Sequence, residues 1–363
     1  MNSAVLNSAA ADAVLQLARP SIRDLTAYSH AHWDPALERL HANESPWAPP
    51  AQVDSLALNR YPEPQPQVLA QAMASYYGVA PENLLLGRGS DEAIDLLTRV
   101  FCEAGRDAVT VLPPTFGMYA VAAQIQGARV LDAPLKADFS LDLEAIAQSL
   151  EQGSKLIWLC SPNNPTGNGL THAAIESVLT LAEGRALVVL DEAYAEFSPN
   201  DSWCKEAACR PGLAVLRTLS KAHALAGIRL GALIAHPVVI ALARKIIPPY
   251  AVPQPTADAG TRALQPAVLA VTQERIRGLI AERERLALAL VRSPWVTHVY
   301  PSEANFLLVA SDDPSVIMQR AEQSGLLLRN FTGRGGLAGA VRISIGSVEQ
   351  NNRLLAALEA TTA

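Results

Sequence analysis

The 363-residue sequence is poor in charged side chains and has no excess of basic ones. Only 18% of its residues are charged, and the formal net charge at pH 7 is -6. The arginines are scattered along the chain instead of forming a stripe, so the electrostatic footprint of a nucleic-acid-binding protein is missing. We therefore expect no nucleic-acid partner.

Long apolar runs and paired cysteine spacings are also missing. No run approaches the roughly 20 apolar residues of a membrane-spanning helix, and the alanine-rich start carries Asp12 without a basic region before an apolar core. The four cysteines do not show the paired spacing of a metal site, and so few in a long chain indicate free thiols in a reducing compartment. We expect a cytoplasmic protein with no membrane association and no metal.

Half of the residues are hydrophobic, and the chain is long enough for two domains. Short apolar segments near Ala108, Leu156, Val188, Val215 and Leu233 alternate with helical patterns. This alternation is typical of an α/β fold with a mostly parallel sheet covered on both faces. In such a sheet, ligands bind at the carboxyl ends of the strands.

The domain organisation follows from a proline-rich segment at 247–255 and a charged helical pattern after it. This pattern leads to short strands and a final helix, which together indicate a smaller α+β domain. We predict a large domain at 61–274, and an N-terminal arm and small domain formed by 1–60 and 275–363.

Lys221 lies in the segment SKAHALAGIRLG at 220–231, among small and apolar residues and upstream of Arg229. A lysine attacks an aldehyde only when it is neutral, and apolar surroundings and a nearby cation lower its pKa. The segment therefore suits a Schiff-base lysine. Taken alone, it is more typical of a solvated lysine at a strand-to-helix junction.

Three upstream segments favour the catalytic interpretation. The loop SPNNPTG at 161–167 follows an apolar strand, and Asp191 ends the apolar segment that begins at Ala186. A carboxylate there could hold a heterocyclic ring nitrogen protonated, as pyridoxal phosphate chemistry requires, or simply cap the next segment. The glycines at 87 and 89 open a helix whose free N–H groups suit a single phosphate.

In this order, and with segments such as PPTFGMY at 113–119 and VRISIG at 341–346, the chain resembles the pyridoxal-phosphate-dependent aminotransferases of fold type I. Within them it is most similar to the histidinol-phosphate aminotransferases, from about Leu17 to the C-terminus. The resemblance implies a large domain with a mostly parallel seven-stranded sheet, a smaller α+β domain, and pyridoxal 5'-phosphate as cofactor.

The resemblance also implies roles for individual residues. Lys221 would form the internal aldimine and move the proton, and Asp191 would bind the pyridinium nitrogen. The remaining cofactor residues would be Asn164 and Tyr194 at the phenolic oxygen, Phe116 stacked on the ring, and Ser90, Asp91, Thr218, Ser220 and Arg229 at the phosphate. Many relatives carry a tyrosine at the position of Phe116, but a phenyl face still stacks.

By the same resemblance, Tyr61 would reach the cofactor phosphate of a second subunit in a homodimer with shared active sites. Arg342 would bind the α-carboxylate of the amino donor, with Asn164 beside it, and Arg329 and Tyr28 would bind the substrate phosphate. The implied reaction converts L-histidinol phosphate and 2-oxoglutarate into imidazole-acetol phosphate and L-glutamate, and runs in reverse during histidine biosynthesis.

Three other functions stay open on the sequence. A threonine-phosphate decarboxylase of the same fold would share Lys221, Asp191 and the phosphate-binding arginine. A broad aromatic or branched-chain aminotransferase would be indifferent to a substrate phosphate. A pyridoxal-phosphate-sensing transcription regulator would need a basic DNA-binding segment, and the stretch before Tyr61 is not basic.

Overall fold

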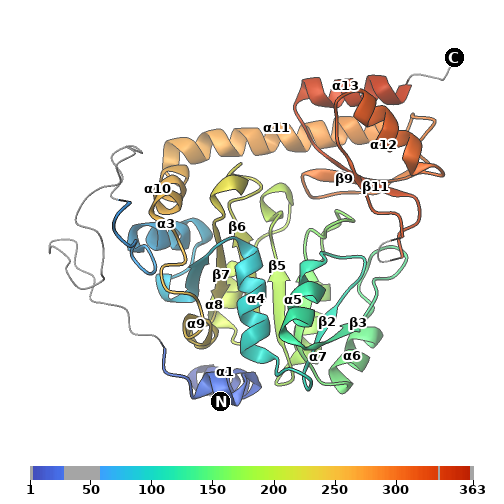
Figure 1. Ribbon diagram of the computed structural model, residues 1–363. Helices are drawn as coiled ribbons and strands as arrows, with labels where there is room; N and C mark the ends of the chain where they lie inside the picture. The colour runs from blue at the N-terminus through green and yellow to red at the C-terminus, as the bar shows by residue number, and fades with distance from the viewer. Residues whose placement is uncertain (1–2, 28–57, 334–335, 360–363) are drawn as a thin grey trace.

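The computed structural model describes residues 3–27, 58–333 and 336–359, and these form two units that are each built on one β-sheet (Figure 1). The large sheet contains seven strands: β1 (Leu84–Gly87), β2 (Ala108–Val111), β3 (Arg129–Asp132), β4 (Ser154–Cys160), β5 (Leu187–Asp191), β6 (Leu213–Thr218) and β7 (Gly231–Ala235). Their order is β1-β7-β6-β5-β4-β2-β3, and β7 runs antiparallel to both of its neighbours. The predicted mostly parallel seven-stranded sheet is confirmed.

Helices cover both faces of this sheet because its strands are apolar on both sides. Along β4, Leu156 and Trp158 pack on one face, and Ile157 and Leu159 pack on the other. The first face is covered by α1 (Ser3–Leu17), α2 (Pro20–Arg23), α4 (Ser90–Phe101), α5 (Met118–Gln126) and α9 (Pro237–Arg244). The second is covered by α3 (Gln67–Tyr77), α6 (Leu143–Glu151), α7 (His172–Ala182), α8 (Cys204–Cys209) and α10 (Gln254–Ala263).

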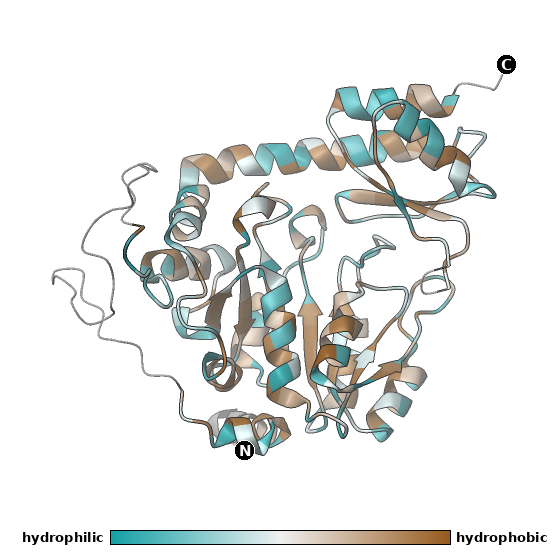
Figure 2. Cartoon of the chain, viewed as in Figure 1, coloured by the Kyte–Doolittle hydropathy of each residue, from teal (hydrophilic) through white to brown (hydrophobic). Residues whose placement is uncertain are grey.

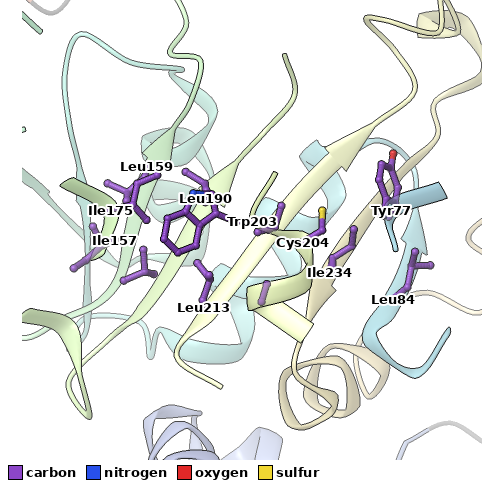
Figure 3. Close-up of a cluster of buried hydrophobic side chains, with 14 of the residues drawn as sticks. Tyr77, Leu84, Ile157, Leu159, Ile175, Leu190, Trp203, Cys204, Leu213 and Ile234 are labelled. Atoms are coloured by element: carbon purple, nitrogen blue, oxygen red, sulfur yellow. The ribbon is translucent and has the colours of Figure 1, made fainter. Parts of the chain in front are cut away.

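Hydropathy follows this layered arrangement. The strands of the large sheet are hydrophobic, and the helices around them expose hydrophilic residues (Figure 2). Figure 3 shows the core on the second face, where Ile157, Leu159 and Leu190 lie near Trp203. Burial of these apolar side chains fixes the strands whose carboxyl ends form the site.

The smaller sheet contains β8 (His298–Val299), β9 (Phe306–Ala310), β10 (Arg329–Asn330) and β11 (Ala340–Ser344), in the antiparallel order β10-β11-β9-β8. It packs with α12 (Pro314–Gln323), α13 (Val348–Glu359) and the last turns of α11 (Pro266–Leu290). The α11 helix runs from α10 to the small sheet (Figure 1). The predicted domain division stays a prediction, and its boundary at 274/275 falls within α11.

Two further observations concern individual helices. Val14 and Leu17 of α1 are buried in the core of the large sheet. Among the described residues, no helix combines the length and apolar character needed to cross a bilayer.

Candidate active site

A cavity of about 550 Å³ opens at the carboxyl ends of β4, β5 and β6. The small sheet closes part of it through Arg329, Phe331 and Arg342. Its lining includes these predicted site residues: Ser90, Asp91, Phe116, Asn164, Asp191, Tyr194, Thr218, Ser220, Lys221, Arg229, Arg329 and Arg342. Residues from eight segments of the sequence therefore converge on one cavity, and their individual roles stay predictions.

Two predicted site residues remain, Tyr28 and Tyr61. Tyr28 lies outside the described residues. Tyr61 is half exposed and stacks on Tyr250, with ring centroids 4.7 Å apart. This exposure is compatible with the predicted role of Tyr61 in a neighbouring subunit, which stays a prediction.

Asp191 is the last residue of β5 and is only 2% exposed. Its Oδ1 accepts a hydrogen bond from the Ala193 backbone N–H at 3.1 Å, and its Oδ2 accepts one from the Tyr119 hydroxyl at 2.8 Å. Burial raises the pKa of Asp191 to about 6, although both hydrogen bonds oppose this rise. The cavity therefore contains a buried carboxylate that would gain from a cationic partner such as a protonated ring nitrogen.

The other end of the cavity is built for an anion. The α4 helix begins at Ser90 after Gly89, whose φ is 80°. A Cβ atom on Gly231 would lie 2.6 Å from the Gly89 carbonyl carbon, so the close approach of β7 to this helix start requires glycine. The first N–H groups of a helix have no partner within the helix, and they attract negative charge.

Hydroxyl and guanidinium groups surround this helix start. Thr218 Oγ1 lies 2.9 Å from Ser220 Oγ, and both side chains line the cavity. Arg229 Nη2 lies 3.1 Å from Asp91 Oδ2. Helix amides, two hydroxyls and one arginine form a donor set that matches a phosphate group.

Lys221 lines the cavity together with Asp191. Its Nζ lies 5.6 Å from the centroid of the Tyr194 ring. Desolvation, and then the positive charge of Arg342, lower the pKa of Lys221. This direction agrees with the reasoning from the sequence, although Arg342 contributes more than the predicted neighbour Arg229.

The small sheet supplies two arginines that face each other across neighbouring strands. Arg329 on β10 is directly opposite Arg342 on β11, and both line the cavity. Like charges in such a pair repel. Desolvation lowers the pKa of Arg342, Tyr194 opposes this effect, and the charge of Arg329 lowers the pKa by a smaller amount. An anion bound between the two guanidinium groups would relieve this repulsion.

Arg342 is also held from two sides by the protein. Its Nη1 donates a hydrogen bond to Asn164 Oδ1, and its guanidinium carbon lies 5.2 Å from the Phe306 ring centroid and 5.3 Å from that of Phe331. Because Oδ1 of Asn164 accepts from Arg342, its amide N–H groups remain to donate to a ligand.

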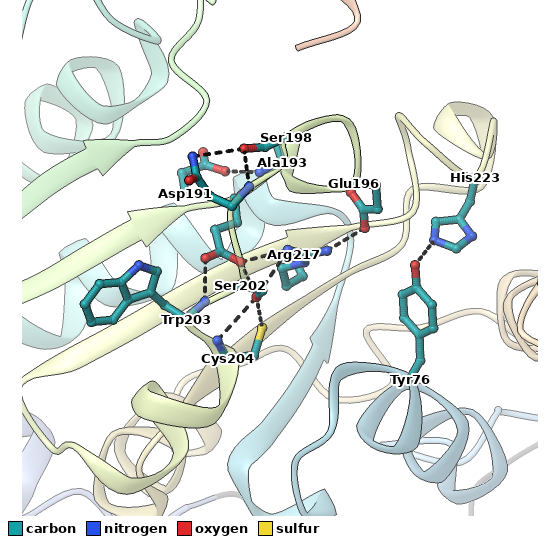
Figure 4. A network of polar contacts seen from close by, with 12 residues as sticks. Tyr76, Asp191, Ala193, Glu196, Ser198, Ser202, Trp203, Cys204, Arg217 and His223 are labelled. Atoms are coloured by element: carbon teal, nitrogen blue, oxygen red, sulfur yellow. Dashed lines mark hydrogen bonds and ion pairs between the residues drawn. The ribbon is translucent and has the colours of Figure 1, made fainter. Parts of the chain in front are cut away.

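A second, buried cluster of charged side chains is formed by Glu192, Glu196 and Arg217 (Figure 4). Glu192 follows Asp191, and Arg217 precedes Thr218. Arg217 donates to Glu192 at 2.7 Å and to Glu196 at 2.6 Å, and all three side chains are at least 90% buried. These residues are not in the cavity lining.

His223, two residues after Lys221, is also absent from the cavity lining. Its Nε2 lies 3.2 Å from the Tyr76 hydroxyl, and burial lowers its pKa (Figure 4). Tyr119 is one residue that the sequence reasoning missed: it does not line the cavity, but its hydroxyl donates to Asp191. The only signal for it was its place in the PPTFGMY segment, because its contact with Asp191 joins residues far apart in the chain.

Comparisons with known proteins agree with this geometry. The model of the family described as "Aminotransferase class I and II" matches residues 31–358. A histidinol-phosphate aminotransferase of Stenotrophomonas maltophilia is 47% identical, over 97% of this chain and 98% of that protein. One of Xanthomonas axonopodis pv. citri is 48% identical with the same coverage.

A solved structure extends the comparison to three dimensions. The histidinol-phosphate aminotransferase of Sinorhizobium meliloti, in complex with pyridoxal-5'-phosphate, has a TM-score of 0.75 and 26% sequence identity. The match covers 83% of this chain and 82% of that one.

Proposed function

Because the chain belongs to the class I and II aminotransferase family, we propose that it transfers an amino group between L-histidinol phosphate and 2-oxoglutarate. The products are imidazole-acetol phosphate and L-glutamate, and histidine biosynthesis uses the reverse direction. The observation that carries this proposal is the opposed pair of Arg329 and Arg342 in the same cavity as Lys221. Curated relatives with this activity at close to half identity support the choice of substrate.

The cofactor is pyridoxal 5'-phosphate, and the residues of the cavity fit it. The start of α4, Thr218, Ser220 and Arg229 would hold its phosphate, and Asp191 would face its ring nitrogen. Phe116 offers an aromatic face, and Asn164 and Tyr194 offer donors for its phenolic oxygen. The bound cofactor supplies an aldehyde and an electron sink for the negative charge that develops on the substrate carbon.

The protein's own groups bind the substrate and move the proton. Lys221 Nζ, with its lowered pKa, would take the proton from the substrate carbon that bears the amine and deliver it to the former aldehyde carbon of the bound cofactor. Arg342 pairs with the α-carboxylate of glutamate, whereas histidinol phosphate has no such carboxylate. Arg329, together with Tyr28, binds the histidinol phosphate group. The opposed arginines can accept either anion, since a guanidinium offers two parallel donors to both.

The proposal extends to assembly, location and domain division. We expect a homodimer in which Tyr61 of one subunit approaches the cofactor phosphate of the other, and its half-exposed ring is compatible with this role. We also expect a cytoplasmic enzyme, as a biosynthetic role implies. The large domain would comprise 61–274, and 1–60 with 275–363 would form the arm and small domain.

The experiment that tests the function is a titration of the visible absorbance of the purified holoenzyme with L-histidinol phosphate. We expect this substrate to bleach the cofactor band and 2-oxoglutarate to restore it, whereas unphosphorylated L-histidinol and L-phenylalanine react poorly. Release of carbon dioxide from threonine phosphate would instead identify a decarboxylase. An equal response to L-phenylalanine would identify a broad aminotransferase.

A further inference from the structure

Tyr119 connects the buried aromatic core directly to the reactive end of the cavity. It lies in α5, is fully buried, and stacks on Trp158 with ring centroids 5.0 Å apart and an angle of 3° between the rings. It also meets the Phe116 ring edge-on at 5.6 Å. Since Trp158 is fully buried as well, the Tyr119 ring has little freedom to turn.

The hydroxyl of this ring contacts the Asp191 carboxylate. It donates to Asp191 Oδ2 at 2.8 Å, while the Ala193 backbone N–H holds Oδ1. Two donors on two different oxygens fix the rotation of the carboxylate plane. Because an ionised carboxylate can accept about four hydrogen bonds, capacity remains for a partner in the cavity.

We propose that Tyr119 is a positioning residue for the proposed aminotransferase reaction, orienting Asp191 toward the cofactor ring nitrogen and stabilising its ionised form. This inference rests on the proposed function for the identity of the ring. It concerns only the contact between two side chains of the protein, so it can be tested without the cofactor.

The charge state of the pair supports this role. Burial, and then the neighbouring Asp191, raise the pKa of the Tyr119 hydroxyl far above its ordinary value, so Tyr119 stays a donor at all working pH values. The hydrogen bond in turn lowers the pKa of Asp191 against the larger effect of burial. The titratable groups that act on Asp191 besides Tyr119 are Asp91, Cys160, Tyr194 and Lys221.

The test compares Tyr119→Phe with wild type and with Tyr77→Phe. The phenylalanine at 119 keeps the ring and its stacking on Trp158 and removes only the hydroxyl. Tyr77 is a matched control because it is also buried, lines no part of the cavity, and has a hydroxyl without a hydrogen-bond partner within the described residues.

The first readout is the titration of Asp191 in the cofactor-free protein, followed by NMR of ¹³C-labelled aspartate and assigned with Asp191→Asn. We expect Tyr119→Phe to raise the pKa of Asp191 by about one unit, since a hydrogen bond to a charged group contributes about a tenfold preference or more. Tyr77→Phe should leave it unchanged. An unaltered pKa of Asp191 in Tyr119→Phe would overturn the proposal, and this result does not depend on which substrate the enzyme uses.

The second readout is the steady-state kinetics of the cofactor-loaded variants. We expect Tyr119→Phe to lower kcat for L-histidinol phosphate about tenfold and to leave KM nearly unchanged, because the substrate-binding arginines are untouched. A shifted titration with an unchanged kcat would also overturn the positioning role. If the wild-type enzyme transferred no amino group, the proposed function would be refuted. The titration of Asp191 would still decide whether Tyr119 stabilises its ionised form.

Discussion

Asp191 and Glu192 are adjacent carboxylates at the end of one strand, both almost fully buried, yet their surroundings differ. Asp191 faces the cavity and is held by a hydroxyl and a backbone amide. Glu192 is paired with the buried Arg217. A buried carboxylate without a cationic partner is available to a ligand, whereas one that is already paired has a structural role.

This comparison predicts that changes on the cavity side affect the reaction and changes on the Arg217 side affect stability. The largest expected effect comes from removing the Lys221 amine. Lys221→Ala should lower turnover at least roughly 1,000-fold, because it removes both the nucleophile and the general base. The variant should still bind the cofactor without a covalent bond, as absorbance spectra and equilibrium dialysis would reveal. Turnover within tenfold of wild type would remove Lys221 from the site.

Asp191→Asn should follow with a loss of roughly 100-fold in kcat. The amide keeps the size of the side chain but cannot supply the negative charge that stabilises a protonated ring nitrogen. Circular dichroism should report an unchanged fold, and steady-state kinetics should report the loss. A variant that loses its fold along with its rate would place Asp191 with the structural residues and break the comparison.

Glu192→Gln should show the opposite pattern. Glutamine at 192 removes one of the two carboxylates that contact the buried Arg217, and Glu196 still pairs with it. We therefore expect a loss of about 2 kcal/mol in the free energy of unfolding, the contribution of one hydrogen bond to a charged group. Urea denaturation of the cofactor-free protein measures this loss, and Glu151→Gln on the surface is the matched control. Equal stability of the two variants would mean that the buried pair contributes no more than an exposed one.

The pH dependence of stability sharpens the contrast. In the cofactor-free protein the folded-state pKa of Asp191 is about 6, above its ordinary value of 3.8. Its contribution to stability is therefore fully present below pH 3.8 and is lost as the pH rises through 6, by roughly 2–3 kcal/mol. The unfolding free energy of wild type minus that of Asp191→Asn should fall over this window. If this difference in unfolding free energy did not change with pH, the raised pKa of Asp191 would be contradicted.

The smallest effect concerns substrate choice. Arg329→Ala should lower kcat/KM for L-histidinol phosphate about tenfold, since it removes a charge-assisted contact with the phosphate at an exposed position. The kcat/KM for L-phenylalanine, which has no phosphate, should change much less. Competition kinetics with both substrates measures the ratio, and equal losses would remove Arg329 from the phosphate site.

The sequence predicted the main fold because the apolar strands are strongly patterned. The segments around Leu156, Val188 and Val215 are buried on both faces and read as continuous apolar runs. The edge strand β3 was not predicted individually, since Arg129 and Asp132 at its ends are exposed and its apolar pattern is short. The packing of α1 against the large sheet also had no local signal.

The site was predictable where a residue ends a strand, follows one or opens a helix, as Asp191, Lys221 and Ser90 do. The contacts that define its chemistry were not, because they join distant segments. The Tyr119–Asp191 hydrogen bond and the opposed pair Arg329 and Arg342 depend on how α5, β5, β10 and β11 pack. Spacing along the chain contains no information about either contact.

The most direct test of the division between the two carboxylates is the single-turnover rate with L-histidinol phosphate, at saturating cofactor and a temperature where both variants remain folded. The rate is followed as the loss of the cofactor's absorbance. We predict a rate near that of wild type for Glu192→Gln and a rate roughly 100-fold lower for Asp191→Asn. Equal rates in the two variants would contradict the account.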